Sequence, residues 1–170
     1  MATLPKLDWS LDVLANWSAP IAFFGRLSMS YIFVLDGYGA IVNASGVAGY
    51  MEANGVSRKL LPLVIAVEFG GGLMVAAGLG ARSAAIALAG FCALTAALFH
   101  ANGADPDQVI NFQKNVAMAG GFLILAAFGP GDWSLDAWRA ARRRASMTLA
   151  RQDEVATIAI SGQADAPKTQ

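Results

Sequence analysis

The sequence predicts an all-α integral membrane protein: a four-helix bundle with short interfacial helices at both ends and in the first outer loop. Of its 170 residues, 56% are apolar and 14% are charged, against about 25% charged in an ordinary soluble domain. The mean hydropathy is +0.50. A soluble domain of this size has too much surface for its volume to bury so many apolar side chains. The lipid bilayer is therefore the first expected partner.

Four apolar stretches are each long enough to cross a bilayer, which takes about 20 helical residues. We expect these spans at 19–38, 60–80, 83–101 and 110–129. Gly80–Arg82 favours a tight hairpin between the second and third spans, and Gly129–Gly131 is expected to end the fourth span. Together the spans and their connections define a four-span domain over residues 19–131.

Three flanking segments are expected around this domain. Residues 1–18, with leucines at helical spacing, predict an interfacial N-terminal segment. Residues 132–151 predict a basic interfacial helix, and the polar residues 152–170 a disordered tail.

The connection between the first two spans is the longest loop of the bundle. In it, Val47, Tyr50 and Met51 share one face of a helical turn that Ser45 could cap. This pattern predicts a short helix across the outer mouth of the bundle.

Lysine and arginine residues flank the spans unequally. One side of the membrane has the two chain ends and the connection between the second and third spans, and it carries most of these residues, including the run Arg142–Arg144. The other side has the remaining two connections and carries fewer. Because cytoplasmic loops carry the excess of Lys and Arg, both termini are expected in the cytoplasm.

Several functions are excluded by composition. The net charge is zero, which argues against nucleic acid as a partner. His100 and Cys92 are the single histidine and the single cysteine of the sequence. Zinc sites usually need three or four His, Cys or carboxylate ligands, so we expect no metal site and no covalently held cofactor.

Two ionisable residues fall deep inside the predicted spans. Arg26 lies in the first span and Glu68 in the second, and charges within spans are costly enough to be candidate site residues. We expect Arg26 and Glu68 to form a buried ion pair. Such a pair either neutralises two buried charges or provides a charged floor for a ligand, with Glu68 as a proton acceptor.

A second polar layer is expected nearer the outer face. Asp36 ends the first span, His100 ends the third, and Lys114 and Asn115 begin the fourth. With Glu68 at its base, this layer predicts one ligand-binding pocket. The alternative is that each side chain separately extends to the lipid headgroups, which a lysine does readily.

The order of these motifs resembles that of the DoxX family of small bacterial four-helix membrane proteins. The resemblance runs from about residue 20 to 137. It depends on short motifs in a fixed order: Gly25–Arg26, Gly37–Gly39, Ala48–Met51, Glu68–Gly72, Gly80–Arg82, His100, Phe112–Asn115, Gly120–Gly121, Gly129–Gly131 and Ser134–Asp136. The chain departs from the family at Ala40, where relatives often carry lysine, so no role of that lysine is transferred.

The resemblance implies a multi-pass protein of the bacterial inner membrane. Some relatives are subunits of thiosulfate:quinone oxidoreductases or associate with redox-stress enzymes. It therefore implies a membrane subunit of a redox system that binds quinone or a small sulfur compound together with a partner protein. A homo-oligomer is a further candidate assembly. The alternative function is a small-molecule transporter or a non-catalytic membrane scaffold, and catalysis by the chain alone is left open.

Overall fold

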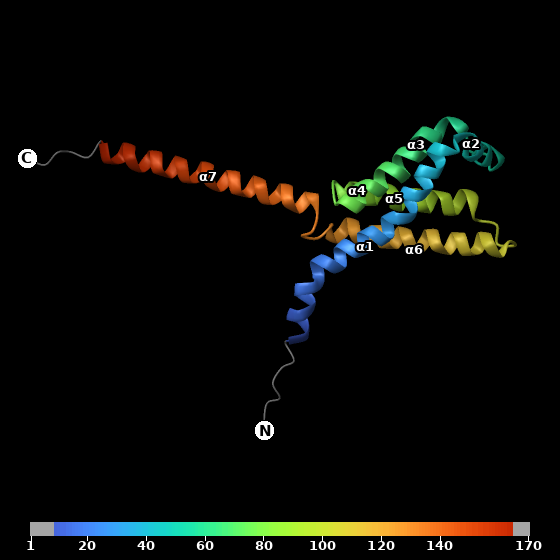
Figure 1. Cartoon of the computed structure of the whole chain (residues 1–170), viewed down its shortest axis with the longest axis horizontal. Helices are drawn as coiled ribbons and strands as arrows, with labels where there is room; N and C mark the ends of the chain where they lie inside the picture. Colours follow the sequence, from blue (N-terminus) through green and yellow to red (C-terminus); the bar gives the residue numbers. More distant parts are fainter. Residues whose placement is uncertain (1–8, 165–170) are drawn as a thin grey trace, which may run out of the picture.

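The computed structural model describes residues 9–164, and the side chains of residues 17–154. All regular elements within that part of the chain are helices (Figure 1). The α-helices are α1 (Trp9–Val42), α2 (Ala44–Ala53), α3 (Leu61–Ile65), α4 (Gly71–Ala77), α5 (Ala81–Phe99), α6 (Pro106–Phe128) and α7 (Leu135–Ala164). A 3₁₀ turn, η1 (Arg58–Leu60), precedes α3, and a π-helical turn, η2 (Ala66–Gly70), joins α3 to α4.

Four of these stretches are long and apolar enough to cross a membrane. They are Trp17–Val42, Arg58–Ala77, Ala81–Phe99 and Pro106–Phe128. Their bounds lie within a few residues of the predicted spans, so the four-span, all-α fold is confirmed. The second span consists of η1, α3, η2 and α4, and the residues at each junction keep right-handed helical dihedrals.

The predicted helix in the long connection is also present, as α2. Its cap is Asn43, whose side chain accepts a hydrogen bond from the Gly46 amide, so the prediction of Ser45 as the cap was wrong. Asn43 is one of the residue types that accept hydrogen bonds well from a free helix-start amide. Gly55, with φ +76°, then turns the chain toward the second span.

The flanking segments differ from the predicted ones. Residues 9–18 continue directly into the first span as part of α1, which contains Pro20 and bends in this region (Figure 1). Residues 1–8 of the expected interfacial segment lie outside the described residues. Proline removes one hydrogen bond of the helical ladder and crowds the preceding turn, so it bends a helix that it does not end.

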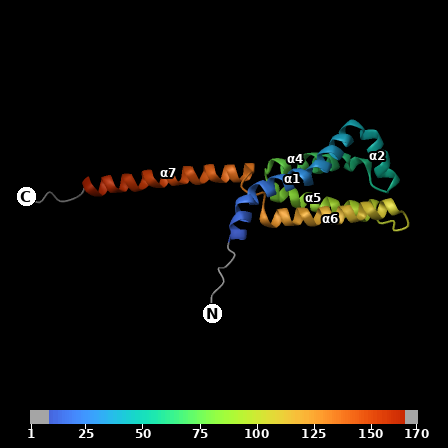
Figure 2. The same cartoon turned by 60° about the horizontal axis from the view of Figure 1, so that its bottom comes forward.

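The predicted disordered tail was wrong for residues 152–164, which belong to α7. The stretch contains three alanines and two glutamines, and both residue types are good helix formers. α7 extends away from the bundle in both views (Figures 1 and 2). Residues 165–170 lie outside the described residues.

The four spans pack as two antiparallel pairs. α5 packs along α6, α1 packs against η2 and α4, and α4 joins the pairs by packing against α5. The pairs diverge toward the end of the bundle that carries α2 (Figures 1 and 2). We call this the α2 end, and the opposite end the α7 end.

The middle of the bundle and its α7 end are filled mostly by apolar side chains, with Arg26 and Ser30 as buried polar residues. Val75, Leu88, Cys92 and Phe122 are fully buried there. Phe33 and Phe122 meet edge to face with ring centroids 5.2 Å apart, a preferred aromatic geometry. This packed region fixes the spacing of the helices, and the two cavities described below lie at the α2 end, where the pairs diverge.

Two glycines let α1 approach the second span closely. A Cβ atom on Gly37 would lie 2.6 Å from the backbone nitrogen of Phe69, and one on Gly72 would lie 3.0 Å from Val34. Small residues of this kind allow close packing of membrane helices. The Gly37 contact falls on η2 itself, so it fixes the position of the π-turn.

The α7 end is held by a carboxylate at a helix start. Asp136 accepts hydrogen bonds from the amides of Gly80 (2.9 Å) and Ala81 (3.0 Å). These amides begin α5, where the first turn of a helix leaves donors unpaired. The carboxylate therefore satisfies two of them and also complements the helix dipole.

Candidate functional site at the α2 end

The expected ion pair between Arg26 and Glu68 is not found in the structure. Arg26 is 2% exposed, and its Nη1 donates to the carbonyls of Val75 and Ala76, at 3.0 Å each. Its Nη2 donates to the Trp133 carbonyl. Arg26 thus caps the end of α4, where the last turn of a helix leaves acceptors unpaired, and it shares the Val75 carbonyl with the Gly78 amide. These contacts place Arg26 at the α7 end, where it has no salt bridge to Glu68.

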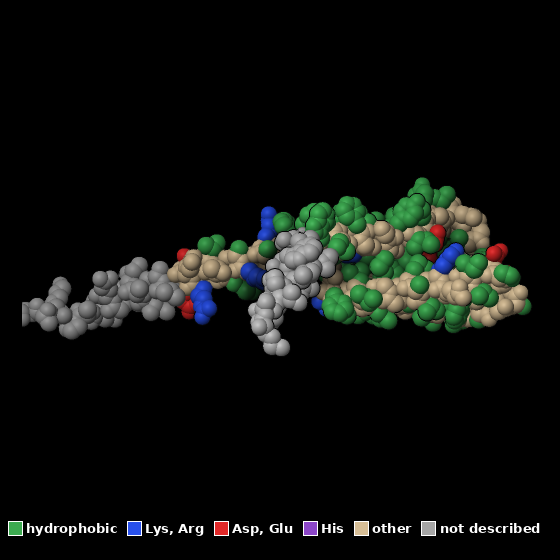
Figure 3. Space-filling view, turned by 90° about the horizontal axis from the view of Figure 1, so that it is seen from below, with side chains coloured by type: hydrophobic (Ala, Val, Ile, Leu, Met, Phe, Trp, Pro, Cys, Tyr) green, Lys and Arg blue, Asp and Glu red, His purple; other side chains and the backbone are tan. Residues whose placement is uncertain are grey.

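The other predicted site residues are brought together at the α2 end. A cavity of about 350 Å³, here called the polar cavity, is lined by side chains from α1, α2, η2, α5 and α6. It includes all five expected ligand-binding residues: Asp36, Glu68, His100, Lys114 and Asn115. In the space-filling view, acidic and basic side chains gather in a furrow near this end, between faces covered by hydrophobic side chains (Figure 3). Three spans and the π-turn therefore direct polar groups into one space.

Hydrogen bonds orient part of this lining. The Thr95 hydroxyl lies 3.1 Å from Asn115 Oδ1, and the Asn115 amide donates to the Asn111 carbonyl. His100 Nδ1 lies 2.6 Å from Gln108 Oε1, so this nitrogen carries the proton in the neutral ring. The opposite nitrogen, Nε2, is then the ring's acceptor, and it becomes a second donor when the ring is protonated.

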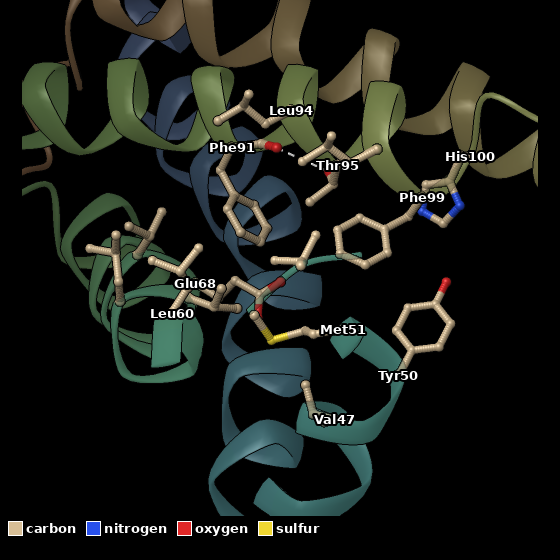
Figure 4. A pocket seen from close by; sticks show the side chains of 15 residues that line it. Val47, Tyr50, Met51, Leu60, Glu68, Phe91, Leu94, Thr95, Phe99 and His100 are labelled. Atoms are coloured by element: carbon tan, nitrogen blue, oxygen red, sulfur yellow. Dashed lines mark hydrogen bonds between the residues drawn. The ribbon is translucent and has the colours of Figure 1, made fainter. Parts of the chain in front are cut away.

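Glu68 occupies the most unusual backbone position of the site. It lies in the middle of η2, and short π-turns within α-helices occur frequently at functional sites. Its side chain extends into the space between the second span and α5 (Figure 4). Among the described residues, its carboxylate has no hydrogen-bond donor and no salt bridge. It is therefore available to a ligand.

A second cavity of similar size adjoins the first. This apolar cavity lies between the second span and α5, and α2 covers one end of it (Figure 4). Its lining is mostly aliphatic and aromatic: Val47, Met51, Val56, Leu60, Leu63, Val64, Val67, Leu94, Leu98 and Phe99, with Tyr50, Glu68, Phe91, Thr95 and His100 on the side shared with the polar cavity.

An aromatic pair stands beside the shared side. The rings of Tyr50, from α2, and Phe99, from α5, are stacked with centroids 5.5 Å apart and an interplanar angle of 16°. Figure 4 shows the Tyr50 hydroxyl on the same side as His100. The stack joins α2 to α5 and so holds α2 over the cavities.

Sequence reasoning gave no site role to Phe91 and Thr95, which lie on the side shared by the two cavities, or to Phe99 beside it. Thr95 carried a usable signal, since it is a hydroxyl within an otherwise apolar part of the third span. Phe91 and Phe99 carried none, because an aromatic side chain in a span can pack against lipid as well as line a cavity. Tyr50 was predicted to share one face of the outer helix with Val47 and Met51, and all three line the apolar cavity. The sequence analysis gave Tyr50 no role in the site.

The polar cavity offers both donors and acceptors. Lys114 supplies an ammonium group and His100 an imidazole, while Asp36 and Glu68 supply carboxylates. With neutral histidine, the two carboxylates outnumber the one cation. Within the part of the chain that the structure describes, no three His, Cys, Asp or Glu side chains cluster as a metal site would require.

The fold and the site define a class: a four-span helical membrane protein with a polar cavity at one end of the bundle. Comparison with known proteins gives the family. The profile of the DoxX family matches residues 21–101, a range that includes Asp36, Glu68 and His100. The chain belongs to the DoxX family and is an inner membrane protein.

Two relatives from Escherichia coli (strain K12) support this assignment. Inner membrane protein YqjF is 47% identical over 111 residues, covering 65% of this chain and 85% of the relative. Inner membrane protein YphA is 31% identical over 123 residues, covering 68% of this chain and 88% of the relative. No solved structure matches the chain.

Proposed function

We propose that the protein is a quinone-binding membrane subunit of a redox system and that the polar cavity holds the quinone head. One observation carries the proposal: Asp36, Glu68, His100, Lys114 and Asn115 line a single cavity within the span region. Ionisable groups inside a membrane are costly and mark functional sites by default.

The donors of the cavity suit the oxidised head. A quinone ring carries two carbonyl oxygens that accept hydrogen bonds, and Lys114 and His100 lie on different helices, α6 and the end of α5. Two donors on separate helices could therefore serve the two carbonyls. The reduced head carries hydroxyls instead, for which the Glu68 and Asp36 carboxylates are acceptors.

The charge balance favours a neutral head over a sulfur oxyanion. Two carboxylates face one lysine in the same cavity. When both carboxyl groups are ionised, an anion would meet like charges there, which costs free energy. Of the two ligand classes implied by the family resemblance, quinone therefore fits the cavity better.

The packed middle of the bundle favours binding over passage. Beyond Glu68 toward the α7 end, the space between the helices is filled by buried apolar side chains, among them Leu88, Cys92 and Phe122. A transported solute would need this core to open. Quinone binding needs no such rearrangement, and the electrons would be exchanged with a partner protein.

The test uses the full chain in lipid nanodiscs and a tailless probe, the ubiquinone ring with a methyl group in place of its chain. His100→Leu and Lys114→Met should each weaken probe binding about twofold to tenfold, since a hydrogen bond contributes about 0.5–1.5 kcal/mol and 1.4 kcal/mol is a factor of ten. Gln113→Met is the matched control, because Gln113 neighbours Lys114 in α6 but lines neither cavity.

Two results would count against the proposal. One is unchanged probe affinity in both variants while their melting temperatures equal that of the wild type. The other is saturable uptake of the probe by vesicles that contain only this protein, which would support the transporter alternative.

A further inference from the structure

We propose that the apolar cavity is the tail site of the quinone and that the ligand reaches it sideways, from the lipid between α3 and α5. This inference rests on the proposed function, in which the polar cavity binds the head. It adds a requirement that the head site does not impose, namely a hydrocarbon chain on the ligand.

The two cavities are continuous at a shared boundary. Tyr50, Glu68, Phe91, Thr95 and His100 line both of them. Every polar side chain of the apolar cavity lies in this boundary, and the rest of its lining is hydrocarbon or aromatic ring. One molecule that spans the boundary would therefore meet polar groups at one end and apolar groups at the other.

The open side of the apolar cavity faces the region of lipid. Leu63 and Leu94 line it from opposite sides, on α3 and α5, and they are 61% and 62% exposed. Both belong to membrane spans. α5 packs against α4 and α6, whereas α3 packs chiefly against α1 and η2. The exposed leucines therefore lie along the opening between two helices that separate toward the α2 end.

The end of the cavity under α2 is covered. Val47, Tyr50 and Met51, on one face of α2, form that part of the lining. Met51 is buried in a small core with Ala40 and Leu61, and Tyr50 is stacked on Phe99. Access along the bundle axis would have to displace α2, whereas access between α3 and α5 needs only side-chain movements.

The size of the cavity limits what it can hold. A volume of about 350 Å³ lies at the lower end of the range of small-molecule sites. It suits the first part of a tail, next to the head, and leaves the remainder in the lipid outside. The preferred ligand is therefore a tailed quinone drawn from the bilayer.

The experiment compares two probes on the full chain in nanodiscs: decylubiquinone and the tailless probe described above. Leu94→Trp adds a bulky ring at the opening between α3 and α5. Leu123→Trp is the control, because Leu123 on α6 is 57% exposed and lines neither cavity. Binding is measured at equilibrium against protein-free nanodiscs, which correct for partition into lipid.

We expect Leu94→Trp to weaken decylubiquinone binding at least tenfold while tailless-probe binding stays within twofold of wild type. Leu123→Trp should change neither. The acyl chains of the nanodisc lipids compete for the apolar cavity in every sample. If the cavity accepted any acyl chain without preference, decylubiquinone would bind no more tightly than the tailless probe.

Four outcomes would overturn the inference. Equal wild-type affinity for the two probes, or unchanged decylubiquinone binding in Leu94→Trp, would refute the tail site and leave the head site standing. Equal losses for both probes in that variant would show that the ring disturbs the head site instead. If neither probe binds the wild-type protein, the proposed function itself fails, and the inference with it.

Discussion

Replacement of Arg26 by methionine tests the structural role that the fold assigns to this residue. Three hydrogen bonds would be lost, to the carbonyls of Val75, Ala76 and Trp133. Hydrogen bonds to charged groups contribute about 1.5–3 kcal/mol each. The lower value applies here because the carbonyls lie near the end of a span, where water can replace part of the loss. Arg26→Met should therefore destabilise the fold by about 4.5 kcal/mol.

The conservative variant and a double mutant sharpen this test. Arg26→Lys should also lose stability, since an ammonium group cannot reproduce the planar fork of donors. Because Arg26 and Glu68 are not paired, Arg26→Met and Glu68→Gln should have additive effects, as distant sites normally do. Unfolding in detergent, followed by circular dichroism, measures both quantities. A loss below about 1 kcal/mol in Arg26→Met, or a coupling energy with Glu68 above about 0.5 kcal/mol, would refute the assigned role.

Three further predictions concern the helix ends, the π-turn and the orientation. Asp136→Ala should cost about 1–2 kcal/mol through loss of the amide hydrogen bonds at the start of α5, whereas Asp136→Asn, which keeps an acceptor, should cost less in the same melts. Gly37→Ala should cost about 1–3 kcal/mol by forcing a Cβ atom against the π-turn, while Gly39→Ala, with open space around its Cβ position, should be nearly neutral. In a background without the native cysteine, a membrane-impermeant thiol reagent applied to intact cells should label Lys59→Cys but not Arg144→Cys. The reverse labelling would invert the predicted topology.

Much of the candidate site could be predicted because the membrane depth of each residue can be read from the sequence. Depth in a membrane follows from position along a span, at about 1.5 Å per residue. Asp36, His100 and Lys114 were placed at one level on that basis, and they line the same cavity in the structure. Depth does not determine the direction in which each side chain points around its helix axis. A different rotation of the helices would have directed the same side chains to lipid, as the alternative interpretation of the sequence proposed.

The sequence by itself determined the class of the fold, the number of spans and the short helix between the first two. The reason is that an apolar run of span length has few other stable structures, since every backbone polar group in lipid must be paired within the segment.

Tertiary structure decided the rest. Arg26 donates to carbonyls at the end of α4. It also donates to the carbonyl of Trp133, which lies in the connection between α6 and α7 and is far from Arg26 in the sequence. The apolar cavity exists because the helix pairs separate at the α2 end, and separation depends on where glycines let helices approach. Gly37 and Gly72 bring α1 against the second span, and this packing leaves Glu68 on a π-turn between two cavities.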